Sequence, residues 1–166
     1  MRPALVSIDP GVHSCAVVAW MVPTACSNSV DATLYAATMT RLTDSPETPL
    51  AVLDQIESWG FFKTPIIIEA PVKYPTKRST HKDVQRLMDV VRAIRSAYPD
   101  DRFFEVTPHA WKGNTPKPIQ ASRILSALTK AEHDAITWPK KSLRHNVLDA
   151  IGIGLFRLGR LGRGSV

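Results

Sequence analysis

Hydrophobic positions near the start of the chain form short runs that end at charged or turn-forming residues. Residues 5–9 are apolar up to one carboxylate, Asp9, and a second apolar run extends from about residue 15 to 21 after Pro10 and Gly11. Valine and isoleucine on both sides of a Pro-Gly break predict two strands joined by a tight connection. Residues 32–41 alternate between apolar and polar and predict a third strand at the edge of the sheet.

Later in the chain, strand patterns alternate with helical ones. An isoleucine run between two prolines, residues 66–68, ends at Glu69 and predicts a strand buried on both faces. Residues 102–107 predict a fifth strand, and a short turn or helix follows it through Lys112. Apolar residues with helical spacing predict helices over residues 45–59, 82–98, 119–130 and 143–158. Ser45 is the expected cap of the first of these helices.

The order of these elements predicts the fold class. Three consecutive strands, followed by alternating helices and strands, favour a single α/β domain over residues 1–166. Its mixed five-stranded sheet would combine an antiparallel meander with parallel strands, flanked by helices. Residues 132–144 show no readable pattern, and the end of the chain, rich in glycine and arginine, predicts a short flexible tail from about residue 159.

Basic residues gather in the second part of the chain. The formal net charge is +6, and residues 71–166 hold eighteen Lys and Arg against eight Asp and Glu. The first seventy residues hold three basic and seven acidic residues. A basic half on a globular domain points to a polyanionic partner, nucleic acid first. A solvated basic face that binds nothing is the alternative.

The cysteines and the hydropathy indicate where in the cell the protein is expected. Cys15 and Cys26 are the only cysteines and lack the spacing of a metal site, so we expect reduced thiols and a cytoplasmic protein. No apolar run reaches the length of a membrane span, and the first residues lack the apolar core of a signal peptide. We therefore expect no membrane partner.

Three carboxylates stand alone in apolar surroundings. Asp9 and Glu69 each end a predicted strand, and Asp149 is the only acid in the apolar last helix. A carboxylate beside a packed core is costly unless it is paired or binds a cation. A pair of divalent cations needs such oxygen ligands and activates water for phosphodiester cleavage. For Asp9, a turn capped by its own carboxylate is the alternative.

These motifs resemble a known family. A strand ending in Asp9-Pro-Gly, a strand ending in Glu69, and a last helix with His one turn before Asp149-Ala resemble the RuvC-type Holliday-junction resolvases of the ribonuclease-H-like superfamily. The segment Phe104-Glu-Val-Thr-Pro-His-Ala-Trp-Lys112, with Lys117 shortly after it, is similar to the family's segment that carries functional lysines. The resemblance spans residues 5–156 through short motifs, and the compact chain fits a phage-type or a host member.

The resemblance implies an active site with two divalent ions, Mg²⁺ or Mn²⁺. Asp9, Glu69 and Asp149 would hold the ions. Asn146 stands at the family's usual spacing, three residues before Asp149, but it offers only a neutral carbonyl oxygen. His145, one residue earlier, is therefore the favoured ligand or general base, and Asn146 is the other candidate. A histidine that merely faces solvent is the alternative for His145.

The resemblance also implies DNA contacts around the acids. Lys112 would contact the scissile phosphate or steady the charge that builds on it, and Lys117 is a weaker candidate for this role. Phosphate contact without catalysis is the alternative for both lysines. Tyr74 lies in the loop where the family presents an aromatic that stacks on an unpaired base, and a loop anchor is its alternative role. The other expected contacts are basic side chains that track phosphates: Lys73, Lys77, Arg78, Lys82, Lys140, Lys141 and Arg144.

A homodimer is the assembly that the resemblance implies, because a four-way junction has two-fold symmetry and two symmetric nicks need two sites. We expect the interface on the helix over residues 82–98, where Met88, Val90, Val91 and Ile94 form a wide apolar surface. The expected function is a metal-dependent endodeoxyribonuclease that resolves four-way and related branched DNA by symmetric phosphodiester hydrolysis. The alternatives are a nuclease on RNA–DNA hybrids or other branched intermediates, and a protein that binds junctions without cutting them.

Overall fold

The computed structural model describes residues 1–24, 31–42, 48–71 and 81–161, which form one mixed sheet flanked by helices. The strands are β1 (Arg2–Asp9), β2 (Ser14–Val22), β3 (Thr33–Arg41), β4 (Ile66–Glu69) and β5 (Phe103–Val106). The helices are α1 (Thr48–Ser58), α2 (His81–Ser96), α3 (Pro108–Lys112), α4 (Lys117–Ser126), α5 (Lys130–Asp134) and α6 (Arg144–Arg157), with short 3-10 turns η2 (Asp100–Arg102) and η3 (Lys141–Leu143).

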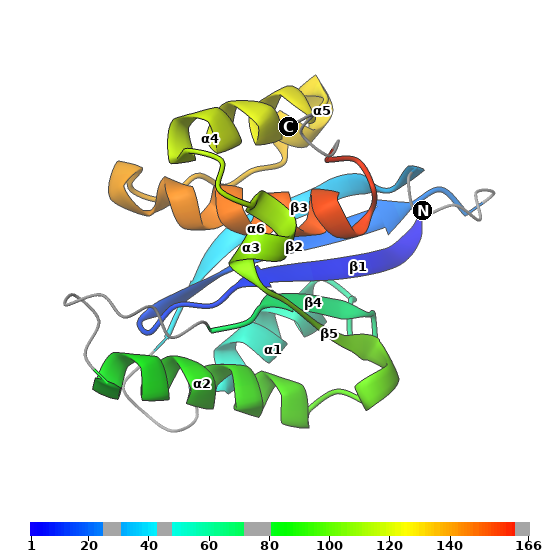
Figure 1. The fold of residues 1–166 in the computed structure, drawn as a ribbon. Helices are drawn as coiled ribbons and strands as arrows, with labels where there is room; N and C mark the ends of the chain where they lie inside the picture. Colours follow the sequence, from blue (N-terminus) through cyan, green and yellow to red (C-terminus); the bar gives the residue numbers. More distant parts are fainter. Residues whose placement is uncertain (25–30, 43–47, 72–80, 162–166) are drawn as a thin grey trace.

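Pairing within the sheet changes from antiparallel to parallel at β1. The strand order is β3-β2-β1-β4-β5 (Figure 1). β1 pairs antiparallel with β2, and β2 with β3, whereas β4 pairs parallel with both β1 and β5. The predicted mixed sheet is confirmed, with β3 at one edge. Because β1 and β4 run the same way, their carboxyl ends lie at the same edge of the sheet, on the left in Figure 1.

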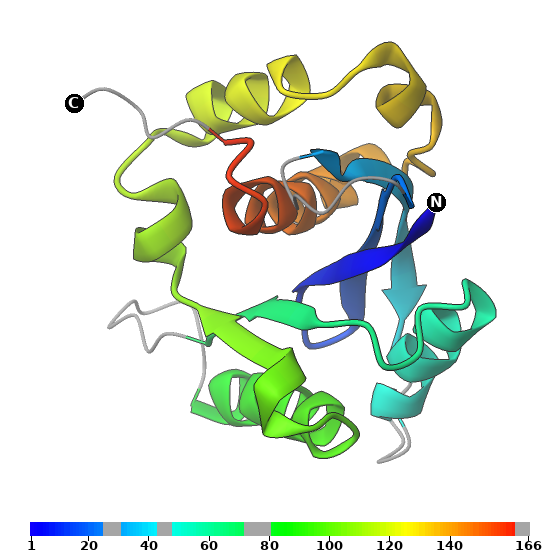
Figure 2. The same cartoon turned by 90° about the vertical axis from the view of Figure 1, so that its right-hand side faces the viewer.

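Alternate residues of the strands divide the core into two layers. On β1, Leu5 packs in a cluster with α4 and α6, while Val6 and Ile8 pack in another with α1 and α2. Figures 1 and 2 show α4, α5 and α6 over one face of the sheet and α1 and α2 over the other. β4 is buried on both faces, as its unbroken isoleucine run predicts.

Some helix ends differ from those that the sequence predicts. The expected cap Ser45 lies outside the described residues. α4 begins earlier than predicted, because Pro118 sits in its first turn, where the missing N–H of proline costs no hydrogen bond, and it ends earlier, at Ser126. A separate short helix, α5, follows α4 and begins with a capping box between Thr129 and Glu132.

The stretch without a readable pattern holds a buried ion pair to the end of the chain. Glu132 in α5 is 2% exposed and accepts hydrogen bonds from Arg160 at 2.6 and 2.9 Å. It also accepts from the backbone N–H groups of Leu34 and Thr129, each at 2.8 Å. Arg160 donates to two further backbone carbonyl groups. Arg160 thus contacts three separate segments of the chain, and the flexibility expected from residue 159 onward stays a prediction.

The helix expected to form the dimer interface, α2, uses most of its apolar face inside the molecule. Val90, Val91 and Ile94 are buried in the cluster that α2 forms with α1 and the sheet. Of the four residues named from the sequence, only Met88 is partly exposed. The wide apolar surface is thus covered by the protein's own core and gives no support to an interface there. Neither α2 nor any other described helix is both long and apolar enough to cross a membrane.

Gly154 allows α6 to lie directly against β2. A methyl group at this position would overlap the indole of Trp20. Trp20 is fully buried and its Nε1 donates to the hydroxyl of Ser7 at 2.9 Å, so the ring has no free space to enter. We expect Gly154→Ala to lower the free energy of unfolding by about 1–3 kcal/mol, as measured by urea denaturation.

A second variant identifies the cause of that loss. Trp20→Leu removes the ring that the added methyl group meets, so the two changes should be non-additive. In the Trp20→Leu background, Gly154→Ala should cost at least about 0.5 kcal/mol less than in the wild type. An equal cost in both backgrounds would show that the close approach to Trp20 is not the reason for the glycine.

Candidate active site

The register of two parallel strands brings the first two carboxylates together. Ile8 on β1 pairs with Ile68 on β4, so Asp9 and Glu69 follow at the same level at the ends of neighbouring strands. Side chains alternate along a strand, and both acids therefore point to the face that α6 covers. Both side chains are half-buried, as expected for residues at the end of an apolar strand.

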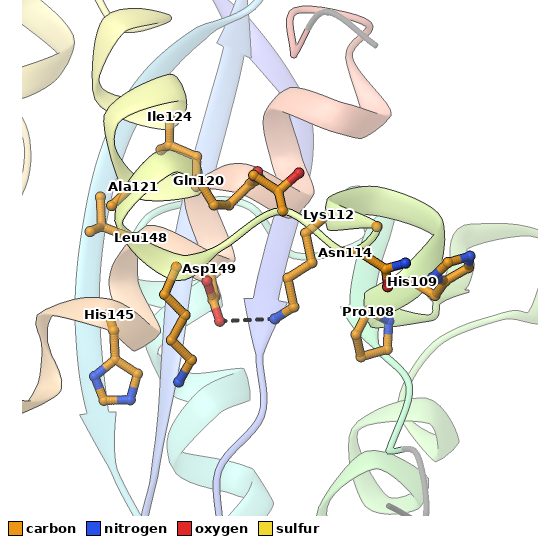
Figure 3. A pocket seen from close by; sticks show the side chains of 13 residues that line it. Pro108, His109, Lys112, Asn114, Gln120, Ala121, Ile124, His145, Leu148 and Asp149 are labelled. Atoms are coloured by element: carbon orange, nitrogen blue, oxygen red, sulfur yellow. Dashed lines mark hydrogen bonds and ion pairs between the residues drawn. The ribbon is translucent and has the colours of Figure 1, made fainter. Parts of the chain in front are cut away.

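Two helices bring the third carboxylate and a lysine to the same place. Asp149 lies in the second turn of α6, which packs on β1 and β4. The Nζ of Lys112, the last residue of α3, lies 3.1 Å from Oδ2 of Asp149 (Figure 3) and 3.3 Å from Oε2 of Glu69. One ammonium group thus contacts carboxylates from β4 and α6, which are far apart in the sequence.

Trp111 fixes the orientation of Glu69. α3 starts directly after β5, with Thr107 as its N-cap and Pro108 at its first position. The buried indole of Trp111 donates its N–H to Oε2 of Glu69 at 2.7 Å. The Nζ of Lys112 lies 4.7 Å from the centre of the same ring, in a cation–π contact. Trp111 therefore holds both the carboxylate and the lysine that contacts it.

The clustered charges raise two pKa values. Burial, together with the negative charges of Asp149 and Glu69, raises the pKa of Asp9 well above its ordinary value, and Lys112 offsets this only in part. Burial alone would lower the pKa of Lys112, but the two carboxylates that it contacts raise it above its ordinary value, so its ammonium stays charged. The acids thus hold more negative charge than Lys112 neutralises, and a bound cation would relieve the excess.

Similar folds occur among solved structures of junction resolvases, although no family model and no curated protein matches the sequence. Thermus thermophilus RuvC in complex with a Holliday junction substrate has a TM-score of 0.60 and 16% identity, with 93% of this chain and 92% of that chain covered. Fowlpox virus resolvase, in complex with substrate Holliday junction DNA, has a TM-score of 0.57 and 13% identity, with 96% and 99% covered. The yeast mitochondrial Holliday junction resolvase Ydc2 has a TM-score of 0.51 and 10% identity, with 95% and 81% covered. The chain has the RuvC-type resolvase fold.

The acids at this edge of the sheet supply the ligand atoms that a hard divalent cation prefers. Asp9, Glu69 and Asp149 offer carboxylate oxygens at one edge of the sheet. In the part of the chain that the structure describes, however, no three acidic, histidine or cysteine side chains stand close enough together to hold an ion. The ammonium of Lys112 lies against two of the three carboxylates, so an ion site here requires Lys112 to give way and the acids to draw together.

The residues expected to complete the site lie around it. His145 and Asn146 are in the first turn of α6, and His145 is exposed in the wall of a cavity that Lys112 and Asp149 also line (Figure 3). Asn146 is half-buried. Lys117, at the start of α4, lines the same cavity, and its charge acts on the carboxyl group of Asp9.

The other predicted DNA contacts fall into two groups. Lys82 is exposed in the first turn of α2, and Lys140, Lys141 and Arg144 are exposed where η3 leads into α6. In Figure 1 the first turns of α2 and α6 lie at the left, at the edge where β1 and β4 end. Four candidates lie outside the described residues: Lys73, Tyr74, Lys77 and Arg78.

The sequence patterns assigned no role to two residues near the three acids, Trp111 and Gln120. The sequence could have pointed to Trp111, because the N–H group of a buried tryptophan needs an acceptor and this tryptophan is next to Lys112. No sequence signal pointed to Gln120, because a glutamine on a helix usually faces solvent. In the structure this side chain is 3% exposed and lies in the cavity wall.

Proposed function

We propose that this protein is a metal-dependent endonuclease that cuts four-way and related branched DNA by phosphodiester hydrolysis. The observation that carries the proposal is the meeting of Asp9, Glu69 and Asp149 around Lys112 at one edge of a RuvC-type fold. These acids come from three elements that are distant in the sequence, and among the described residues none of them pairs with an arginine, as Glu132 does with Arg160. Their accumulated charge suits a cation-dependent reaction on a phosphate.

The three acids are the proposed ligands of Mg²⁺ or Mn²⁺, and His145 or Asn146 completes the set. Two divalent ions in such a site activate the attacking water and stabilise the leaving oxygen. Trp111 orients Glu69 through its 2.7 Å hydrogen bond, which preserves the direction of that carboxylate while the charges around it change. His145, exposed beside Asp149, has room to take a proton from water in the same cavity.

Lys112 has a different role in this proposal. In the structure its ammonium pairs with Glu69 and Asp149. If cations took over the charge of these acids, the ammonium of Lys112 would be free to contact the phosphate, where a compact charge would steady the negative charge that builds during cleavage. A cation that moves from the carboxylates to the phosphate must sit at the end of a flexible side chain, and the ammonium group of lysine does.

Branched DNA is the proposed substrate because two of the structural neighbours are complexes with Holliday junctions. The exposed cations in the first turn of α2 (Lys82) and where η3 leads into α6 (Lys140, Lys141 and Arg144) support contact with phosphate backbones. We also propose a homodimer, since symmetric nicks in a two-fold junction need two active sites. Its location in the cytoplasm stays a prediction from the cysteines.

Nicking of a synthetic four-way junction in the presence of Mg²⁺ tests the proposal, with Asp9→Asn as the control. We expect the wild type to make paired nicks and Asp9→Asn to make none. Cleavage of RNA–DNA hybrids without cleavage of junctions would instead identify a hybrid nuclease. Junction binding without any cleavage would identify a protein that only binds.

Replacement of Lys112 separates catalysis from binding. We expect Lys112→Ala to lower the rate of junction cleavage at saturating enzyme by about a hundredfold, while junction affinity falls by about threefold or less. Lys130→Ala is the matched control, because Lys130 is an exposed lysine on α5 whose ion pair with Asp134 lies at the surface. Single-turnover kinetics and gel-shift titration provide the two measurements. A loss of affinity with an unchanged cleavage rate would make Lys112 a backbone contact only.

A further inference from the structure

Gly152 leaves space on α6 for the indole of Trp111. A glycine inside a helix is less favourable than an alanine, so its presence there calls for a physical reason. A methyl group on Gly152 would lie 2.5 Å from Cζ3 of Trp111 and 2.8 Å from Cδ1 of Ile124. These separations are too short for carbon atoms, so the ring or the helix would have to move. Trp111, which is 4% exposed, therefore packs directly against α6.

The two ends of this indole have different partners. Cζ3 belongs to the six-membered ring, which lies at Gly152. Nε1 belongs to the five-membered ring and donates to Oε2 of Glu69 at 2.7 Å. An indole is rigid and planar, so a displacement at one end is carried to the other. Trp111 thus connects α6 to the carboxylate that ends β4.

The place of Gly152 on α6 relates this contact to the third acid. Gly152 follows Asp149 by three residues, so the two lie on the same face of the helix. The ammonium of Lys112, the residue after Trp111, lies 3.1 Å from Oδ2 of Asp149 and 4.7 Å from the centre of the indole. The ring therefore contacts Glu69 directly and Asp149 through Lys112.

We infer that Trp111 and Gly152 are positioning residues that together set the separation of Glu69 and Asp149. The inference rests on the proposed function and adds two residues outside the proposed ligands. The place of the indole against α6 fixes the direction of Glu69, and with it the distance between ligands on two different elements. Replacing a residue that orients a ligand typically weakens metal binding by about 10–100-fold.

Two glycines of α6 give a matched pair of variants. Gly152→Ala and Gly154→Ala add the same methyl group to the same helix, the first against Trp111 and the second against Trp20. Electron paramagnetic resonance of Mn²⁺ measures the ion affinity of the folded protein without DNA and without reference to activity. We expect Gly152→Ala to weaken Mn²⁺ binding by about tenfold and Gly154→Ala to change it by less than about twofold. Equal affinities in the two variants would overturn the inference.

Changes at Trp111 keep the test independent of how stable Gly152→Ala is. Trp111→Phe keeps an aromatic ring but loses the N–H donor, and we expect it to weaken Mn²⁺ binding by about tenfold as well. Trp111→Leu removes the ring that the added methyl group meets. In that background, Gly152→Ala should weaken binding by no more than about a further twofold. A further loss as large as in the wild type would overturn the inference, because the glycine would then act through another contact.

Nuclear magnetic resonance of the indole N–H groups reports the same contact without any metal ion. Trp111→Phe identifies the signal of Trp111, which its charged acceptor moves downfield. We expect this signal to move upfield in Gly152→Ala, where the ring is displaced, and to keep its position in Gly154→Ala. An unchanged signal in Gly152→Ala would overturn the inference.

One comparison separates this inference from the proposed function. If the wild type binds Mn²⁺ no more tightly than Glu69→Gln does, the acids do not form an ion site, and the proposed function and the inference fail together. If the wild type binds Mn²⁺ more tightly than Glu69→Gln and cuts junctions, but Gly152→Ala and Trp111→Phe bind the ion as tightly as the wild type, the inference alone fails.

Discussion

Glu69→Gln is expected to reduce junction cleavage on the order of a thousandfold or more and to leave junction affinity the same or higher. Glutamine keeps the length of the side chain and an oxygen that accepts the N–H of Trp111, so the local geometry is retained. It removes one negative charge from the three acids, which weakens the binding of divalent ions and also lowers repulsion of the phosphate. Single-turnover cleavage and gel-shift titration measure the two effects.

The control for Glu69→Gln is the same substitution at another acid. Glu105 on β5 is exposed and pairs with Arg95 away from the three acids, so Glu105→Gln should leave cleavage within about twofold of the wild type. If Glu69→Gln cuts as fast as Glu105→Gln, Glu69 has no role in binding the ions. A parallel loss in both affinity and thermal stability would instead indicate misfolding.

Glu132→Gln is expected to lower the free energy of unfolding by about 3–5 kcal/mol, the largest stability effect that we predict. The substitution leaves the guanidinium of Arg160, which is 15% exposed, without its carboxylate partner. It also weakens the hydrogen bonds that join α5 to β3 and to the end of the chain. Urea denaturation measures the loss.

Asp134→Asn is the matched control on the same helix. Asp134 pairs with Lys130 at 2.6 Å, but their side chains are 64% and 88% exposed, so the pair is screened by water. We expect this variant to lose no more than about 0.5 kcal/mol. Equal losses in the two variants would show that burial of the Glu132–Arg160 pair has no special importance.

The same pair makes stability depend on pH. Burial alone would raise the pKa of Glu132, but hydrogen bonds from Arg160 and from two backbone N–H groups lower it from 4.5 to about 2. A lowered pKa in the folded state means that the carboxylate stabilises the fold above pH 4.5 and that this contribution is lost as the pH falls toward 2. The contribution is about 3 kcal/mol, so the stability difference between wild type and Glu132→Gln should shrink by about this amount over that range.

Much of the fold follows from local patterns in the sequence. The apolar runs that end at Asp9 and Glu69 predict strands, and alternation along them decides which side chains face α6. Asp149 could be named as a candidate site residue because it is the only acid in the apolar last helix. These three predictions use spacing within single elements, which the sequence records directly.

The contacts between distant elements were harder to predict. The pairing of Glu132 with Arg160 joins two stretches without periodicity, and the burial of Gln120 depends on how α4 lies against α6. The wide apolar surface of α2 was misread for a related reason, since the sequence does not show how much of a helix its own core covers. Lys112 was expected to contact the scissile phosphate, which stays a prediction, and its ion pairs with Glu69 and Asp149 were not foreseen.

The position of bound Mn²⁺ in crystals tests most directly whether the three acids form one ion site. Anomalous scattering locates the ion without reference to activity. We predict Mn²⁺ between the carboxylate oxygens of Asp9, Glu69 and Asp149, with a second ion about 3.5–4 Å from the first and with Lys112 moved away from the acids. Mn²⁺ bound elsewhere, with Lys112 still paired to Glu69 and Asp149, would contradict the proposed site.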